Sequence, residues 1–224
     1  MLTRLGQARR CGSSRERSEA ASRRVARVPR MAFLDPATLE AGPVRLEPLT
    51  LQHAGPLAEA MGDDRPADLW FARTPEPADL AADIATKLAA AEQGQWLPFV
   101  VLQDAVPVGS TSFLHPQAEI PSVEIGATWL GPAARRTGVN TAAKSLLLTH
   151  AFDVWGCRRV TFRATWWNRA SRAAIERIGA SFEGRIRNDR VTREGLVTDS
   201  AQYAITDAEW PAVRRHLQFL REHG

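Results

Sequence analysis

One segment of the chain has the residue types and spacing that bind phosphate groups. It runs Trp129-Leu-Gly-Pro-Ala-Ala-Arg-Arg-Thr-Gly-Val-Asn140, and its second glycine, Gly138, stands where a predicted helix begins. The first backbone N–H groups of a helix have no acceptor inside the helix and lie at the positive end of its dipole. Gly138 would let the backbone approach phosphate oxygens closely, while Arg135 and Arg136 would add charged donors. The segment therefore predicts an anion site that would fit a diphosphate.

This segment is not a nucleotide P-loop, because no Gly-Lys-Ser or Gly-Lys-Thr sequence follows and no acidic metal partner is evident. A simpler interpretation stays open as well. A helix start that contains a glycine and two solvated arginines would have the same sequence.

A second helix start follows the next predicted strand, in the sequence Asn168-Arg-Ala-Ser-Arg-Ala-Ala-Ile-Glu-Arg-Ile-Gly-Ala180. Taken alone, Asn168 is a good N-cap residue and Gly179 a helix C-terminal stop. Both helix starts follow strands that should run parallel, so they should lie at the same end of the sheet. Ligands of α/β units favour that end.

The spacing of apolar residues predicts the elements that position these helix starts. Strands are expected at 43–50, 96–103, 106–115, 121–130, 158–166, 180–187 and 197–205. Helices are expected at 51–61, 77–92, 138–155 and 169–178, and from Thr206 or Asp207 to near the C-terminus. Thr206 and Glu209 could form the capping box of that last helix. The buried stripe of the 138–155 helix is predicted to comprise Val139, Ala142, Ala143, Leu146, Leu147, Ala151 and Val154, with His150 on the same stripe.

The order of these elements predicts the fold class. Consecutive hairpins give antiparallel pairing, while the strand–helix–strand unit at 121–166 gives one parallel crossover. We therefore expect an α/β (α+β) fold, with a mixed, mostly antiparallel sheet flanked by helices in a single domain at 31–224.

The two helix starts together resemble the acetyl-coenzyme-A signature of the GNAT N-acetyltransferases. The resemblance rests on the 135–140 loop followed by the Asn-x-x-Ser and Glu-Arg-Ile-Gly residues of 168–179. It extends over about residues 43–206, including Val108-Gly109-Ser110 and Glu124-Ile-Gly126, and is strongest to the ribosomal-protein N-terminal acetyltransferases (the RimJ/RimL-like branch). The element order agrees with the fold of that family.

The resemblance implies a binding site for acetyl-CoA as co-substrate, with no metal. The loop would hold the pyrophosphate through backbone N–H groups, the strand before it would pair with the pantetheine arm, and Asn168 would bond the pantetheine. Ser171 would lie near the thiol and is a candidate proton donor to the thiolate. The implied coenzyme-binding residues are Ala127, Trp129, Leu130, Arg135, Arg136, Thr137, Gly138, Val139, Asn140, Asn168 and Ser171.

Two residues depart from the pattern of the family. Asn140 stands where the loop has its second glycine, although branch members often carry asparagine there. Ile175 stands where the second helix has a tyrosine, which is often the acid that protonates the thiolate. The identity of that acid is therefore open, with water as the alternative to Ser171. Tyr203, on the last predicted strand, is interpreted as structural.

The implied reaction is direct attack of a neutral amine on the thioester carbonyl. Glu124 is the candidate base, because Ser122, Gly126 and Thr128 on the same predicted strand face are small and would let a substrate lie beside it. At about pH 7.5, a peptide α-amine with a pKa of about 7.7–8.0 is roughly a quarter to two-fifths neutral, whereas a lysine amine with a pKa of about 10.4 is neutral in only about one molecule in a thousand. This difference favours an N-terminal α-amine of a protein or peptide as acceptor.

Length and composition exclude several other classes of protein. The chain has 224 residues, no run of 18 apolar residues and two cysteines, Cys11 and Cys157. These features argue against a membrane-spanning helix, a disulfide framework and a four-thiolate zinc site. No cluster of His, Cys, Asp or Glu has metal-ligand spacing. We expect a cytoplasmic monomer or homodimer with no membrane partner.

The formal net charge of +4 arises from the N-terminal extension. Residues 1–30 hold nine arginines and two glutamates, which leaves 20 basic and 23 acidic residues in the rest of the chain. We expect this extension to be disordered. It could be a transit peptide or a basic arm for RNA; otherwise we expect no nucleic-acid partner.

Two alternatives to the leading hypothesis stay open at this point. The acceptor could be a small cationic amine such as an aminoglycoside or polyamine, since Asp63, Asp64, Asp68 and Glu76 could make an acidic entrance. The chain could also be a coenzyme-A-binding module without turnover, because Ile175 replaces the tyrosine.

Overall fold

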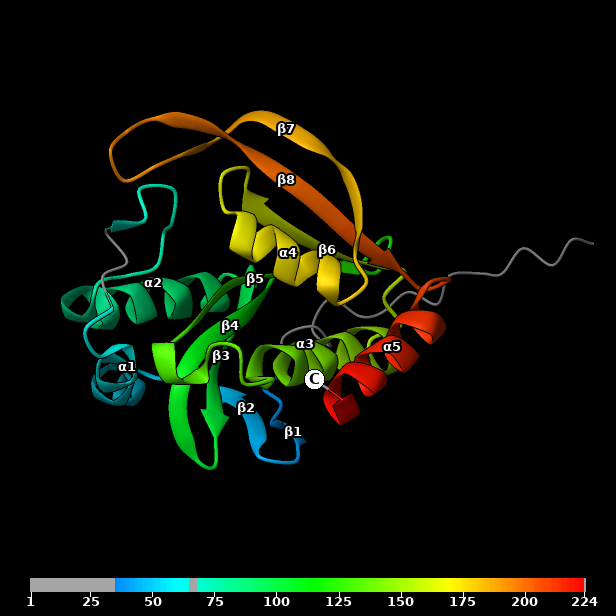
Figure 1. The fold of residues 1–224 in the computed structure, drawn as a ribbon, viewed down its shortest axis with the longest axis horizontal. Helices are drawn as coiled ribbons and strands as arrows, with labels where there is room; N and C mark the ends of the chain where they lie inside the picture. Colours follow the sequence, from blue (N-terminus) through cyan, green and yellow to red (C-terminus); the bar gives the residue numbers. More distant parts are fainter. Residues whose placement is uncertain (1–34, 65–67, 224) are drawn as a thin grey trace, which may run out of the picture.

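The computed structural model describes residues 35–64 and 68–223, so the predicted extension at 1–30 lies outside the described residues. Within the described part, the strands form one sheet in the order β1-β2-β3-β4-β5-β6-β8-β7. They are β1 (Leu39–Ala41), β2 (Val44–Pro48), β3 (Trp96–Gln103), β4 (Val106–Gln117), β5 (Ser122–Leu130), β6 (Arg159–Thr165), β7 (Ser181–Val191) and β8 (Val197–Thr206). Figure 1 shows β7 and β8 as a long ribbon that arches away from the rest of the molecule.

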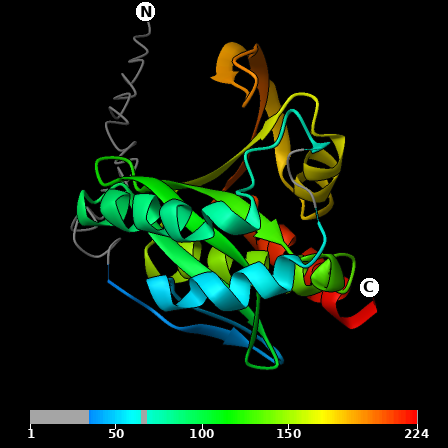
Figure 2. The same cartoon turned by 90° about the vertical axis from the view of Figure 1, so that its left-hand side faces the viewer.

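The helices cover the two faces of the sheet. They are α1 (Ala54–Met61), α2 (Leu80–Glu92), α3 (Val139–Thr149), α4 (Arg169–Arg177) and α5 (Trp210–His223), with short turns η2 (Leu51–His53), η4 (Pro77–Asp79), η5 (Pro132–Ala134) and the π-helical η6 (His150–Val154). Figure 2 shows α1 and α2 together on one face. The residues of α3 and α5 share the larger apolar core on the other face.

Strand β3 illustrates how the sequence sorts side chains between these faces. Phe99 and Val101 lie in the larger core with α3 and α5, whereas Val100 and Leu102 lie in the smaller core with α1 and α2. Successive side chains of a strand point to opposite faces. An internal strand covered on both faces is therefore apolar at nearly every position, as β3 is.

The predicted fold class is confirmed. The sheet is mixed and mostly antiparallel, and β5 with β6 is its parallel pair. The sequence did not predict β1, which is three residues long and pairs with β2. The predicted helix at 138–155 ends as an α-helix at Thr149 and continues as the π-helical η6. Because that turn changes the helical spacing, Val154 is 67% exposed and not part of the buried stripe.

The last helix begins later than predicted. Helix α5 starts at Trp210, one residue before Pro211, which has no N–H to donate and suits a helix start. The Glu209 carboxylate accepts a hydrogen bond from the Thr206 N–H at 2.8 Å. The two residues therefore form a turn that precedes α5 instead of opening it.

Candidate active site

Strands β5 and β6 separate after a short paired stretch. They pair in parallel from Ser122 with Arg159 to Glu124 with Thr161, and not beyond. Each strand keeps its other neighbour, since β4 pairs with β5 and β8 pairs with β6. The facing backbone edges beyond Glu124 and Thr161 are therefore free to hydrogen-bond an extended ligand.

A β-bulge interrupts β5 within this separated part. Ser110 pairs with Trp129 and Ser112 with Gly126, so two residues of β5, Ala127 and Thr128, stand opposite one residue of β4. Ala127 has a positive φ of 47°. A bulge of this kind leaves backbone groups unpaired and reverses the alternation of side chains along the strand.

The bulge corrects one expectation about Glu124. The sequence predicted that Thr128 shares a strand face with Glu124, as it would in a regular strand. In the structure the Thr128 hydroxyl instead contacts the Lys144 amine of α3 at 2.6 Å, on the opposite face. Leu130 likewise lies in the core with α3, whereas Trp129 lies in the core with α1 and α2.

The start of α3 leaves several backbone donors without a partner. Gly138 is the N-cap residue with a left-handed φ of 86°, and no side chain caps the helix. In the described part of the chain, the N–H groups from Arg136 to Thr141 have no hydrogen-bond acceptor. A Cβ built at Gly138 would meet nothing within 4 Å, so the space in front of these donors is open. An anion such as a diphosphate fits this helix start.

Arg135, one of the two arginines predicted to add charged donors at this helix start, has partners within the chain. Its guanidinium forms an ion pair with Asp64, and its Nε donates to the Leu130 carbonyl at 2.8 Å. The roles of Arg135 and Arg136 in coenzyme binding stay predictions. Arg177 of α4, which the sequence did not single out, donates to the Thr141 hydroxyl at 2.9 Å and brings a cation to the first turn of α3. The spacing of residues within α3 or within α4 does not predict this contact, because it joins two separate helices.

The start of α4 is capped as the sequence predicted. The Asn168 Oδ1 accepts a hydrogen bond from the Ser171 N–H at 3.0 Å. Ile175 is buried in the larger core. Tyr203 is buried too, and its hydroxyl donates to Glu176 and accepts from Arg172. These contacts agree with a structural role for Tyr203.

Glu124 lies at a cavity of about 340 Å³ that cationic groups surround. Burial raises the pKa of the Glu124 carboxyl, while the charges of Arg163, Arg190 and His115 oppose that rise. The Arg163 Nε lies 3.8 Å from a Glu124 carboxylate oxygen. The cavity is lined by His115, Gln117, Ser122, Val123, Glu124, Arg159, Thr161 and Arg163. A buried carboxylate with a raised pKa can accept a proton near neutral pH.

The segment before α2 is tied to β6 and to the turn between β7 and β8. Trp70 packs against the indole of Trp167 with ring centroids 6.1 Å apart, and the Phe71 carbonyl accepts from the Thr165 hydroxyl at 3.1 Å. Glu76 forms an ion pair with Arg193 at 2.9 Å. Since Arg135 also pairs with Asp64, two of the four acidic residues in the suggested acidic entrance are neutralised.

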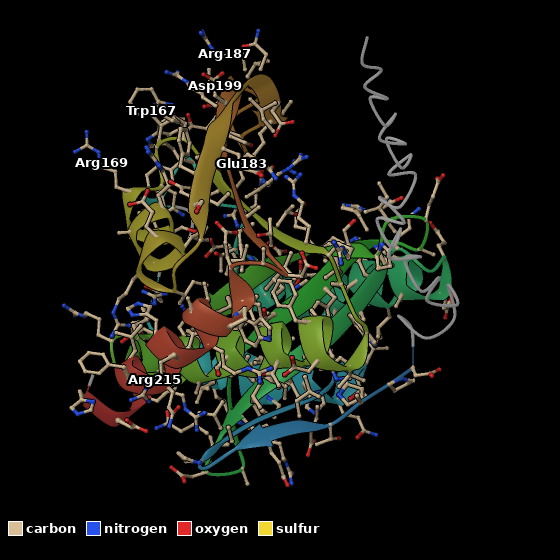
Figure 3. All side chains as sticks on the ribbon, turned by 90° about the vertical axis from the view of Figure 1, so that its right-hand side faces the viewer. Trp167, Arg169, Glu183, Arg187, Asp199 and Arg215 are labelled. Atoms are coloured by element: carbon tan, nitrogen blue, oxygen red, sulfur yellow. The ribbon has the colours of Figure 1, made fainter. Side chains whose placement is uncertain are left out.

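Ion pairs between β7 and β8 stabilise the outer part of the β7–β8 ribbon. Asp199 is buried and pairs with Arg185 and Arg187, and its hydrogen bond from the Asn188 N–H is the main cause of its lowered pKa. Figure 3 shows Arg187 and Asp199 together on this ribbon, with Trp167 and Arg169 at the start of α4. Trp167 is 52% exposed.

Residues 35–64 and 68–223 hold neither a metal-binding cluster nor a membrane-spanning helix. No three His, Cys, Asp or Glu side chains there could hold a metal ion. No helix there is long and apolar enough to cross a membrane. Cys157 is the cysteine of this part of the chain, and burial raises the pKa of its thiol to about 12.

A family model described as an acetyltransferase (GNAT) domain matches residues 44–181 of this chain. The chain belongs to the GNAT acetyltransferase family. The predicted resemblance is thus confirmed, and the match covers both helix starts, β5 and Glu124. GNAT proteins of this kind are N-acetyltransferases, so the chain is an enzyme of that class.

Relatives of known sequence or structure agree with the GNAT assignment. Over 87 residues, 39% of this chain, it is 37% identical to Bacillus subtilis YdaF, whose name gives it as a candidate ribosomal N-acetyltransferase. That match spans about half of the relative, 46% of its length. A GCN5-related N-acetyltransferase from Brucella melitensis is 29% identical with a TM-score of 0.74, covering 83% of this chain and 85% of that one. Mycobacterium smegmatis RimJ, solved in complex with CoA-disulfide, shares the fold at 22% identity with a TM-score of 0.69, covering 84% of this chain and 95% of that one.

Proposed function

We propose that this GNAT enzyme transfers an acetyl group from acetyl-CoA to the N-terminal α-amine of a protein or peptide. The name of YdaF, a candidate ribosomal N-acetyltransferase, supports a protein acceptor at the level of a relative. The single observation that carries it is the surroundings of Glu124, a partly buried carboxylate that lies among Arg163, Arg190, His115 and Asp189.

Acetyl-CoA would supply the acetyl group as a reactive thioester. The N–H groups from Arg136 to Thr141 would bind its diphosphate, with the Arg177 guanidinium beside them. The unpaired edge of β5 from Ala127 to Leu130 would hydrogen-bond the pantetheine arm. The Asn168 Oδ1 is already occupied by its helix, so its amide NH₂ would be the group that bonds the pantetheine.

Glu124 would remove a proton from the acceptor amine. Its raised pKa makes the carboxylate a better proton acceptor than an exposed glutamate. The neutral amine nitrogen then bonds to the acetyl carbon, the carbon–sulfur bond breaks, and the sulfur leaves with the bonding pair. The nitrogen releases its surplus proton to solvent water, which returns a proton to the group that protonates the sulfur. Backbone N–H groups near Leu130 would face the carbonyl oxygen as it gains charge. The Ser171 hydroxyl, which has no hydrogen-bond acceptor in the described residues, would protonate the sulfur, with water as the alternative donor.

The charges around Glu124 favour a peptide acceptor over a polycation. A polyamine or aminoglycoside would bring several positive charges to a cavity whose carboxylates already have cationic partners, since Glu183 pairs with Arg159 and Asp189 pairs with Arg163. A peptide α-amine brings one charge and loses it near neutral pH. Asp64 and Glu76 offer little compensation, because both are already ion-paired.

The test is an acceptor panel at fixed acetyl-CoA, containing N-terminal peptides, the same peptides with a blocked α-amine, a polyamine and an aminoglycoside. We expect transfer to free peptide N-termini and loss of about 100-fold or more in kcat for Glu124→Gln. The matched control is Glu47→Gln, because Glu47 is also a strand glutamate paired with an arginine, Arg45. Faster transfer to the polyamine than to any peptide would contradict the proposed acceptor.

Calorimetry separates catalysis from binding. Tight coenzyme binding without transfer to any acceptor would favour the binding module without turnover. No binding of acetyl-CoA or CoA at all would overturn the proposed function as a whole.

A further inference from the structure

Two lysines are buried against the sheet, on opposite faces and beside neighbouring residues of β4. Lys87 of α2 forms an ion pair with Asp83 at 2.6 Å and lies 3.4 Å from the Ser110 hydroxyl. Lys144 of α3 donates to the Thr128 hydroxyl at 2.6 Å and to the Thr111 hydroxyl at 3.2 Å. In the described part of the chain, no carboxylate pairs with Lys144.

Burying a lysine amine without a carboxylate destabilises a protein, and an apolar side chain of similar length would fill the same space at lower cost. Burial lowers the pKa of the Lys144 amine to about 7, so charged and neutral forms coexist near neutral pH. Packing alone therefore gives no reason for a lysine at this position.

The contacts of Lys144 lead directly to the bulge in β5. The Thr128 hydroxyl that accepts from Lys144 also lies 2.8 Å from the Thr111 hydroxyl. When Thr111 donates to it, Thr128 donates in turn to the Gly126 carbonyl, with an oxygen–oxygen distance of 3.2 Å. This bond spans Ala127, the residue with positive φ. Thr128 is exposed on its other side, at the unpaired edge of β5. The buried amine is thus one hydroxyl group away from the edge that would receive the thioester.

We propose that Lys144 is a positioning residue for acetyl transfer, which holds the β5 bulge in its reactive shape through the Thr128 hydroxyl. The proposal rests on the proposed function. A protonated amine that donates to a hydroxyl oxygen strengthens the hydrogen bond that the hydroxyl itself donates. Lys144 therefore tightens the Thr128–Gly126 bond and fixes the direction of the free N–H groups at the bulge. A displacement of about 1 Å in such groups can lower a rate about 100-fold.

The charged form of Lys144 has no competing partner nearby. Lys144 is the sole charged residue of α3, and the titratable groups of β4 and β5, His115 and Glu124, line the cavity on the other face. Of the remaining elements packed on α3, β1 carries the exposed Glu40 and β2 carries the Arg45–Glu47 pair. The turn η6 carries His150 and Asp153, which pairs with Arg214, and α4 brings the exposed Arg177 to Thr141. The charged groups of α5, which are Arg214, Arg215, His216, Arg221, Glu222 and His223, are all exposed.

The test compares Lys144→Met with Lys87→Met, which removes the other buried lysine at the same sheet. We expect Lys144→Met to lower kcat by about 10- to 100-fold while KM for acetyl-CoA changes less than about threefold. The ratio of wild-type to Lys144→Met rates should be largest at about pH 6 and should fall by pH 8, because the amine loses its charge near pH 7. Lys87→Met should leave that ratio independent of pH.

A second pair of variants keeps the lysine in place. Thr128→Val removes the hydroxyl and should lose about as much rate as Lys144→Met, whereas Thr128→Ser keeps the hydroxyl and should restore it. Wild-type kcat and a flat rate ratio for Lys144→Met, in a protein that still binds acetyl-CoA by calorimetry, would overturn this proposal and leave the proposed function standing. Absence of acetyl-CoA binding in the wild type would overturn both.

Discussion

The helices α3 and α4 both follow strands of the parallel pair, yet they begin in opposite ways. Helix α3 starts at Gly138 in a left-handed conformation with no side-chain cap. Helix α4 starts at Asn168, whose side chain satisfies the Ser171 N–H. Helix α3 also buries its one charged residue, Lys144, whereas α4 carries Arg169, Arg172, Glu176 and Arg177, none of which is fully buried.

The difference suits the two helix starts to different parts of a ligand. A capped helix start is stable by itself, while an uncapped one keeps its donors for a ligand. Under the proposed function, the charged part of the coenzyme would bind at α3, and its neutral, amide-rich part would bind beside Asn168. Each of the following substitutions either makes one helix more like the other or removes a feature in which α3 and α4 differ.

The largest effect is expected from giving α3 a negative charge at its start. Gly138→Asp should weaken CoA binding by about 100-fold or more, because a carboxylate would repel the diphosphate and occupy the same N–H groups. Gly138→Asn is the matched control, since it has the same shape without the charge and tolerates a positive φ better than most residues. Calorimetry measures both, and equal affinities for the two variants would count against the anion site.

The second effect concerns the buried charge of α3. The pKa of Lys144 is lowered in the folded state to about 7 from an ordinary 10.5, so above pH 7 the unfolded chain binds a proton that the folded chain lacks. The free energy of unfolding of the wild type should therefore rise relative to Lys144→Met by about 1.4 kcal/mol per pH unit between about pH 7 and pH 9. Urea unfolding at several pH values measures this slope. Parallel curves for the two proteins would show an ordinary Lys144 pKa.

A smaller effect is expected from removing the cap of α4. Asn168→Ala should lower the free energy of unfolding by about 1 kcal/mol. Asn168→Asp keeps the capping oxygen and should retain that stability, but it lacks the amide NH₂ and should raise KM for acetyl-CoA. If Asn168→Asp binds acetyl-CoA as the wild type does, the amide does not contact the pantetheine.

The smallest effect is expected at the ion pair that holds Arg135 away from the start of α3. Both side chains are partly exposed, so Asp64→Asn should change the free energy of unfolding by less than about 1 kcal/mol. The released guanidinium should strengthen CoA binding by about threefold or less. A weaker affinity would instead mean that Asp64 places Arg135 for binding.

Much of this arrangement could be predicted from the sequence, because it depends on local patterns. The nearly continuous apolar run of β3, the glycine at 138 and the capping asparagine at 168 each favour a local conformation. The parallel crossover follows from the order of elements and a general rule of handedness. The structure confirms the fold, the Asn168 cap and the parallel pair.

The remaining features depend on contacts between distant segments. The bulge at Ala127 carries no glycine that would mark it, yet it turns Thr128 toward Lys144. The sequence does not indicate that Lys144 is buried, because a lysine in an apolar helix is normally a surface residue. Arg135, Arg177 and Arg193 likewise found partners at Asp64, Thr141 and Glu76, more than 30 residues away in each case.

The burial of the Cys157 thiol affects whether the enzyme can form a mixed disulfide with CoA, the thiol that acetyl transfer releases. A disulfide forms when a thiolate attacks a second sulfur, and the Cys157 thiol is buried with a pKa raised to about 12. Within residues 35–64 and 68–223, the enzyme thus offers no exposed thiol that could trap spent CoA as a mixed disulfide. Mild oxidants that would covalently block an exposed cysteine should therefore leave Cys157 unmodified.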